Sequence, residues 1–166
     1  MTIKIGQVAI GVPRGQSEKM VSEIREKLGA IEWVFDTVKF SGDVFGKNTD
    51  DTEAKLNFNY DLIPGVEFEI LEYVRGSNWH EERLDAFSGQ PIISHLGLHI
   101  DDWDEFCEVR DKLLGAGIEI AQEANTFSHS NENIPSNRKY HYLILDTIFL
   151  FGFDLKLIYR RNTDDE

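Results

Sequence analysis

The chain has 166 residues and a formal net charge of -13, from 17 Lys and Arg against 30 Asp and Glu. A field of this sign repels phosphate backbones and anionic membranes, so we expect no nucleic-acid partner and no membrane partner. No apolar run approaches the roughly 20 residues that cross a bilayer. The first residues lack a signal-peptide pattern and Cys107 is the single cysteine, which together predict a reducing, cytoplasmic location.

The first half of the chain has the pattern of a strand, a helix and three further strands. Alternating apolar residues predict the first strand over 3–12. Ser17 is a good N-cap, apolar residues at helical spacing follow it, and Gly29 ends them, so we expect a helix over 17–28. The remaining predicted elements are strands over 33–40, 54–62 and 66–74, with a polar loop over 41–52.

The second half repeats this order after a polar connector over 76–91. Its first strand, 92–100, is apolar apart from His95 and His99, which share one face because side chains alternate along a strand. A helix with an apolar stripe is expected from Trp103 to Gly115. The remaining predicted elements are strands over 118–124, 139–145 and 149–159, with a polar loop over 125–137.

The two halves align with a nearly constant offset, which indicates an internal repeat. Residues 5–12 match 93–100 at an offset of 88, and the helices both finish in Leu-Gly at an offset of 86. Residues 68–73 match 155–160 at an offset of 87. We therefore predict one structural domain composed of a module over 1–75, the connector 76–91, a second module over 92–161 and an acidic tail over 162–166.

The repeat resembles the vicinal oxygen chelate superfamily, which includes glyoxalases, bleomycin-resistance proteins and extradiol dioxygenases. The segments 95–102, 140–147 and 155–160 carry the resemblance. It implies an α+β fold in which two βαβββ modules form an incurved mixed sheet around a cavity. It also implies a small-molecule ligand, a homodimer, and an aromatic residue such as Trp79 of the connector over the cavity.

Metal ligands of that superfamily stand on the first and fourth strands of each module, which correspond here to Gln7, Glu69, His95 and Lys156. The first three suit a divalent metal such as Zn, Ni, Mn or Fe. Lys156 stands where a Glu is usual, and an ammonium has no lone pair with which to ligate. Either Lys156 takes the place of the metal and pairs with Glu69, or it turns away and the other three residues hold the ion.

Three functions stay open on this basis, because the fold does not fix the reaction. The first is a glyoxalase- or dioxygenase-like enzyme with a degenerate metal site, acting as a lyase, isomerase or dioxygenase through Glu69 and Lys156. The second is a metal-free ligand-binding or sequestering protein of the resistance type, without a cofactor. The third is an acidic interaction protein that keeps the fold without a working cavity. His99, His141 and Arg138 are the candidate substrate-binding residues.

Overall fold

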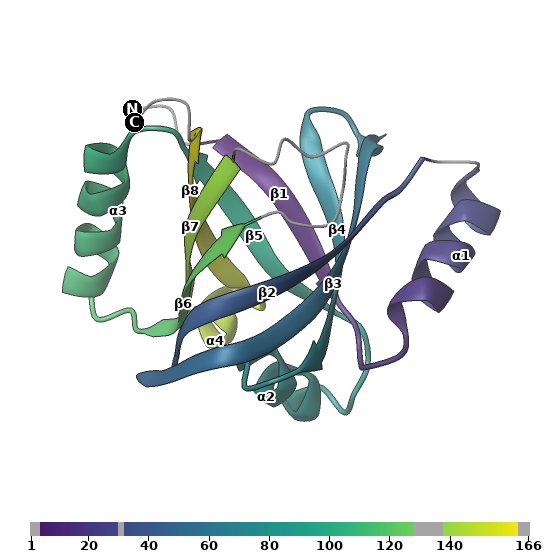
Figure 1. Ribbon diagram of the computed structural model, residues 1–166, viewed down its shortest axis with the longest axis horizontal. Helices are drawn as coiled ribbons and strands as arrows, with labels where there is room; N and C mark the ends of the chain where they lie inside the picture. Colours follow the sequence, from purple (N-terminus) through teal and green to yellow (C-terminus); the bar gives the residue numbers. More distant parts are fainter. Residues whose placement is uncertain (1–3, 30–31, 128–137, 163–166) are drawn as a thin grey trace.

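The computed structural model describes residues 4–29, 32–127 and 138–162 (Figure 1). Its elements follow the repeated order that the sequence predicts. The first module contains β1 (Lys4–Gly11), α1 (Ser17–Leu28), β2 (Val34–Val44), β3 (Lys47–Ile63) and β4 (Val66–Arg75). After α2 (Trp79–Ala86), the second contains β5 (Ile92–Ile100), α3 (Trp103–Gly115), β6 (Ile120–Phe127), β7 (Arg138–Leu145), α4 (Ile148–Phe151) and β8 (Asp154–Asn162). Within these ranges no helix has both the length and the apolar character needed to span a bilayer.

The strands close into one mixed barrel in the order β1-β4-β3-β2-β6-β7-β8-β5. Within the modules, β1 pairs with β4 in parallel and β5 pairs with β8 in parallel. The modules join through two antiparallel pairs, β1 with β5 and β2 with β6. The predicted α+β fold, with two βαβββ modules in one curved mixed sheet, is therefore confirmed. Closure makes the inward faces of both modules share a single interior.

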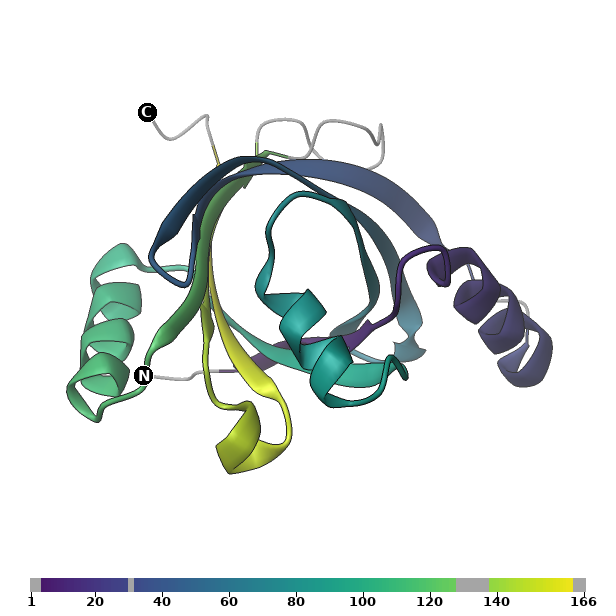
Figure 2. The ribbon, with the colours of Figure 1, turned by 90° about the horizontal axis from the view of Figure 1, so that it is seen from below.

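Helices α1 and α3 lie on opposite outer sides of the barrel (Figure 1), and α2 lies across one end of the ring of strands (Figure 2). The main buried cluster draws side chains from the strands of both modules and from Trp79 of α2. Two smaller clusters pack α3 and α1 against the outside of the sheet. Burial of these apolar faces, at about 25 cal/mol per Å², holds the layers together.

The predicted polar loop over 41–52 is wrong, because β2 and β3 continue through it as a hairpin. Phe45 and Gly46 form the two-residue turn with φ of 47° and 75°, and Asp43 accepts a hydrogen bond from the Gly46 N–H. Positive φ at both turn residues matches the right-handed twist of a hairpin. The end of β2 also pairs with β6, so a polar segment is held as a strand by contacts from the other module.

The predicted strand over 149–159 is wrong at its start, where the chain forms α4 and turns at Gly152 with φ of 79°. Phe149 is 84% exposed, so this apolar run is not a buried strand. Asp154 accepts hydrogen bonds from the backbone N–H groups of Thr147 and Ile148, which fixes the turn. The predicted connector also contains a helix, α2, whose N-cap Asn78 accepts from the Glu81 N–H.

Helix α1 is capped from a distant strand instead of by the predicted N-cap, Ser17, which is the first residue of the helix. The Glu72 carboxylate on β4 accepts from the backbone N–H groups of Gly15 and Ser17, at 2.8 and 2.9 Å. Burial alone would raise the pKa of Glu72, but these hydrogen bonds and the Lys55 charge leave it lowered. Negative charge is favoured at a helix N-terminus, so β4 fixes where α1 begins.

We expect Glu72→Ala to lower the free energy of unfolding by about 2 kcal/mol, because two charge-assisted hydrogen bonds are lost. Urea unfolding near neutral pH measures the change, and Glu108→Ala on the exposed face of α3 is the control. Since the carboxylate has its lowered pKa only in the folded state, the difference should shrink below the ordinary value of 4.5. A loss no larger than that of the control would contradict the capping role.

Candidate functional site

Polar side chains from both modules meet inside the barrel. Alternation along β1 turns Gln7 inward beside Gly97 of β5, where a Cβ on residue 97 would lie 2.8 Å from the Gln7 Cβ. Gln7 Oε1 lies 2.9 Å from His95 Nε2, 88 residues further along the chain, and 3.1 Å from Lys156 Nζ. Three of the four positions singled out by the repeat are therefore in direct contact.

The orientation of the Gln7 amide follows from its neighbours. Its Nε2 donates to the Glu67 carboxylate, which leaves Oε1 facing the other two groups. Because Oε1 can only accept, Lys156 Nζ and His95 Nε2 both donate to it. His95 Nδ1 then accepts from Ser94 Oγ, 3.2 Å away. His95 is thus a neutral, Nε2-protonated imidazole, and burial and the Lys156 charge hold its pKa well below the usual range.

Glu69, the fourth position, faces the same interior from β4. It is 1% exposed, and its Oε2 has no hydrogen-bond partner. Burial raises the pKa of Glu69 from 4.5 to about 7, against the opposing charge of Lys156 and with a further rise from Glu67. Lys156 acts from a distance, since no carboxylate of the described residues lies within 4.0 Å of its Nζ. Glu69 can therefore take up or release a proton near neutral pH.

A divalent metal ion does not fit these contacts. Within the described ranges, no group of three or more His, Cys, Asp or Glu side chains could hold one. Gln7 Oε1 already accepts from two donors, Lys156 Nζ and His95 Nε2. The remaining lone pair of the His95 ring, on Nδ1, faces Ser94 Oγ. The Lys156 ammonium lies 3.1 Å from the same Gln7 oxygen, and its charge opposes a second positive charge there.

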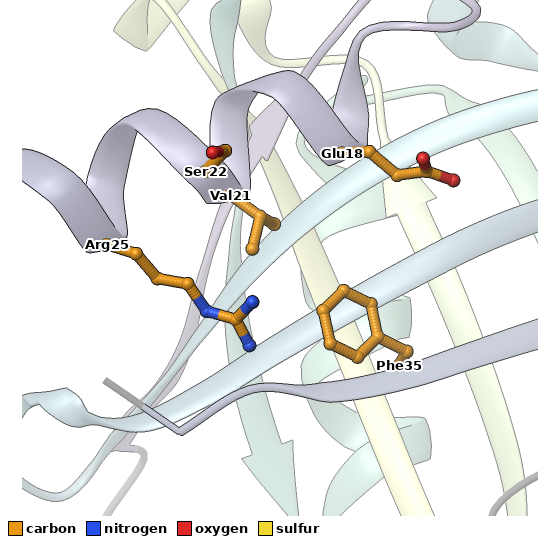
Figure 3. A pocket seen from close by; sticks show the side chains of 5 residues that line it. All are labelled: Glu18, Val21, Ser22, Arg25 and Phe35. Carbon is orange, nitrogen blue, oxygen red and sulfur yellow. The ribbon is translucent and has the colours of Figure 1, made fainter. Parts of the chain in front are cut away.

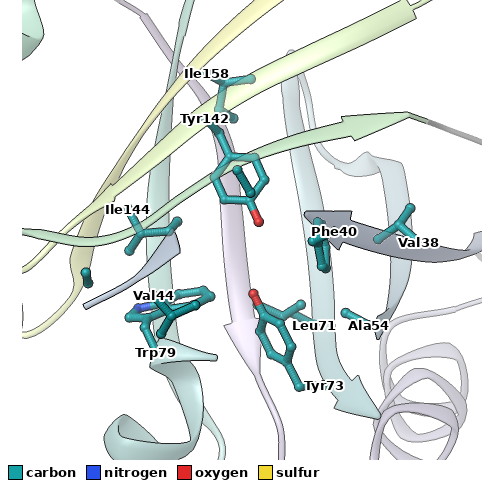
Figure 4. Packing of buried hydrophobic residues seen from close by; sticks show 12 residues of the cluster. Val38, Phe40, Val44, Ala54, Leu71, Tyr73, Trp79, Tyr142, Ile144 and Ile158 are labelled. Atoms are coloured by element: carbon teal, nitrogen blue, oxygen red, sulfur yellow. The ribbon is translucent and has the colours of Figure 1, made fainter. Parts of the chain in front are cut away.

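A second group of interior hydrogen bonds lies on the other side of Lys156. The Gln122 amide contacts the hydroxyls of Tyr142 and Tyr73, with Nε2 donating at 2.7 and 3.2 Å. The two hydroxyls point toward one another in the packed cluster (Figure 4). Lys156 Nζ lies 4.9 Å from the centroid of the Tyr142 ring, a cation–π contact. Lys156 thus links the Gln7 and His95 contacts to the tyrosines.

Helix α2 is fastened across the end of the barrel by a buried network around Asp154. Trp79 Nε1 and Arg83 Nε donate to the Asp154 carboxylate at 2.8 and 3.0 Å, and Arg83 also pairs with Asp146 at 2.9 Å. The Trp79 ring packs 6.0 Å from that of His95. Next to it, His80 is buried with neither ring nitrogen hydrogen-bonded. The connector therefore supplies the wall of the site at this end.

The three predicted substrate-binding residues lie in different places. His99 is on the inward face of β5 and packs its ring against Gly6. His141 is on the outer face of β7 below α3, with its Nδ1 3.0 Å from Asn125 Oδ1, away from the Gln7 and His95 contacts. The backbone of Arg138 begins β7, and its side chain lies outside the described part of the chain.

A hollow of about 310 Å³ lies on the outer surface between α1 and β2 (Figure 3). Its lining includes Val21, Phe35 and Arg25, whose guanidinium carbon lies 5.5 Å from the Phe35 ring centroid. None of the residues that the repeat singles out lines it. We therefore take the barrel interior as the candidate site.

No family model matches this sequence, and no curated protein sequence matches it. Solved structures of similar fold include a triple mutant of 4-hydroxymandelate synthase from Streptomyces coelicolor, with 14% identity and a TM-score of 0.57 over 96% of this chain and 49% of that one. Methylmalonyl-CoA epimerase from Mycobacterium tuberculosis has 13% identity and a TM-score of 0.54 over 93% and 85%. A hypothetical protein from Bacillus halodurans C-125 has 15% identity and a TM-score of 0.57 over 98% and 97%.

These likenesses identify the fold. The synthase and the epimerase are members of the vicinal oxygen chelate superfamily, and the present chain has the vicinal oxygen chelate fold. The chain spans about half the length of the synthase chain. At this level of identity the comparisons do not select a reaction.

The repeat does not predict several residues that contribute to the interior. Tyr73, Gln122 and Asp154 have no counterpart at the repeated ligand positions, and His80 lies in the connector. Alternation carries a partial signal, because Asp154 is two residues from Lys156 and Tyr73 is four from Glu69 on the same strand faces. The contact of Trp79 with Asp154 joins elements 75 residues apart and follows only from barrel closure.

Proposed function

We propose that this protein binds a small molecule inside the barrel and exchanges a proton with it through Glu69, without a metal ion. The observation that carries the proposal is the buried Glu69 carboxyl, whose Oε2 has no partner and whose pKa is raised to about 7 by burial. A group with this pKa is half-protonated near neutral pH, which is the condition for general acid–base work. Its burial destabilises the fold, as is usual for functional carboxyls.

Titration of the Glu69 carboxyl by ¹³C NMR is the direct test of this proposal. We expect a midpoint near 7, which is absent in Glu69→Gln. A midpoint near the ordinary value of 4.5 would remove the basis for proton transfer. Exposed Glu108 of α3 supplies an internal reference in the same spectrum.

The absence of a metal from the proposed chemistry is supported by the position of Lys156. Replacing it with Glu would supply the carboxylate that family members use and would remove the opposing charge. We therefore expect Lys156→Glu to bind one Zn²⁺ or Ni²⁺ per chain, with Glu69, His95 and Gln7 as further ligands, while the parent binds neither with comparable affinity. Isothermal titration after chelator treatment measures this, with Lys112→Glu on α3 as the matched charge control. Stoichiometric metal binding by the parent would refute metal independence.

A second candidate is a ligand-binding or sequestering protein without catalysis. It is favoured by the hydrogen bonds of Gln7 and His95, which are satisfied within the protein. Exchange of a carbon-bound proton of the ligand with deuterium from the solvent separates the two functions, since only proton transfer produces it. The homodimer, the cytoplasmic location and a glyoxalase-like or resistance-type assignment stay predictions, and light scattering in solution tests the first.

A further inference from the structure

We propose that Lys156 binds an anionic oxygen of the ligand, so that the ligands of this protein are small organic anions, carboxylates above all. The inference deepens the proposed function and rests on it, because it assigns the ligand class of the same interior. Three observations carry it: the missing acidic partner of Lys156, the state of the groups around it, and its unused donors.

The first observation is a contrast between Lys156, in the barrel interior, and Arg83, at the end of the barrel. Arg83 pairs with two carboxylates, Asp146 at 2.9 Å and Asp154 at 3.0 Å. Lys156 has no carboxylate within 4.0 Å among the described residues, although the chain carries 30 acidic residues against 17 basic ones. A partly buried cation without a counter-charge is costly, and an external anion would relieve that cost.

The second observation is that the neighbours of Lys156 do not supply this counter-charge. Glu69 is buried on β4, and its carboxyl oxygens lie more than 4.0 Å from the Lys156 ammonium. The carboxylate of Glu67 accepts a hydrogen bond from the Gln7 amide. His95 is neutral and donates to the same Gln7 oxygen as Lys156. Lys156 therefore has no described carboxylate at ion-pair distance to balance its charge.

The third observation concerns the geometry of the ammonium itself. An ammonium has three donors, and one of them is used by Gln7 Oε1 at 3.1 Å. The centroid of the Tyr142 ring lies 4.9 Å from Lys156 Nζ, so the ring contacts the charge without accepting a conventional hydrogen bond. Two donors remain, which suits the two oxygens of a carboxylate or the single oxygen of an enolate. Lys156 is only partly buried, so it can be reached from solvent.

Matched pairs of carboxylate and amide test the proposal: acetate with acetamide and benzoate with benzamide. We expect the carboxylates to raise the melting temperature and to shift the Lys156 ε-methylene signal in ¹H–¹³C spectra, and the amides to do neither. Lys156→Gln should lose the carboxylate response by at least about tenfold in affinity, which equals roughly 1.4 kcal/mol. Lys112→Gln, which removes the same charge from the surface of α3, should keep the full response.

Equal responses to carboxylate and amide, an unchanged response in Lys156→Gln, or no response of the Lys156 signal to any carboxylate would each overturn the inference. Should Lys156→Gln not fold, Lys156→Arg keeps the charge and must keep the preference for carboxylates. The Glu69 titration and the metal affinity of Lys156→Glu do not depend on these ligands. Failure of the anion site is therefore distinguishable from failure of the proposed function.

Discussion

The Glu69→Gln variant is expected to be more stable than the parent by about 3 kcal/mol near pH 8. In the parent, burial raises the pKa of Glu69 from 4.5 to about 7. The unfolded chain loses the proton above 4.5, while the folded protein holds it until about 7. The parent therefore loses stability as pH rises through this window and no further above it. Glutamine does not titrate, so the variant escapes this loss.

Urea unfolding near pH 4.5, 6 and 8 measures the effect, which should be small at the first value and largest at the last. Glu108→Gln, on the exposed face of α3, corrects for the general gain from removing one negative charge. The same Glu69→Gln substitution should abolish proton exchange with a bound ligand. A variant that is less stable than the parent at high pH would mean that the folded protein stabilises the Glu69 carboxylate, against the proposed role.

The fold could be predicted from the sequence because it is a repeat. Residues 5–12 and 93–100 share one apolar pattern, and a nearly constant offset over both halves implies two copies of one unit. Elements with strong local signals were also predicted well: α1 ends at Gly29 and α3 follows the N-cap Asp102, whose side chain accepts from the Glu105 N–H. In these places local preference and final structure agree.

The errors fall where specific hydrogen bonds, between modules or within a turn, override the preference expected from the apolar pattern. Segment 41–52 is polar and has the composition of a loop, but pairing of Gly42 with Ala124 and of Asp43 with Glu123 makes it a strand. Segment 149–159 begins with an apolar run that suits a strand, yet Asp154 binds the backbone at Thr147 and Ile148 and turns it into α4. No local pattern encodes either contact.

The candidate site divides in the same way. The contact of Gln7 with His95 could be expected, because the repeat makes their positions equivalent. The contact of Lys156 with Gln7 could not, since the sequence suggested a pair with Glu69 or a side chain turned away. The wall formed by Trp79 and Asp154 could not, since it depends on where α2 docks after the barrel closes. The raised pKa of Glu69 could not be predicted either. It depends on complete burial of the Glu69 carboxyl, whose own Oε2 has no hydrogen-bond partner.

Acidification is expected to destabilise the parent more than the His80→Leu variant, by about 3 kcal/mol between pH 7 and pH 4. His80 is 1% exposed and neither ring nitrogen has a hydrogen-bond partner. Burial, with a smaller contribution from the Arg83 charge, lowers the pKa of His80 from 6.5 to about 4. The unfolded chain takes up a proton below 6.5 and the folded protein resists until about 4, so stability falls across this window. Leucine cannot be protonated, so this component disappears.

The free energy of unfolding of the two proteins, measured in urea at several pH values, gives the difference, and His80→Asn replaces the variant if leucine does not fold. His141→Gln is the control, since His141 lies outside the barrel and keeps a partner in Asn125.

Hydrogen exchange then shows which element is destabilised by protonation of His80. His80 packs against Tyr73 and beside Trp79, so its protonation should loosen α2 first. As the pH is lowered, the amides of α2 should therefore begin to exchange faster before those of β5, and only in proteins that retain His80. Simultaneous exchange of both elements would mean that α2 does not open separately.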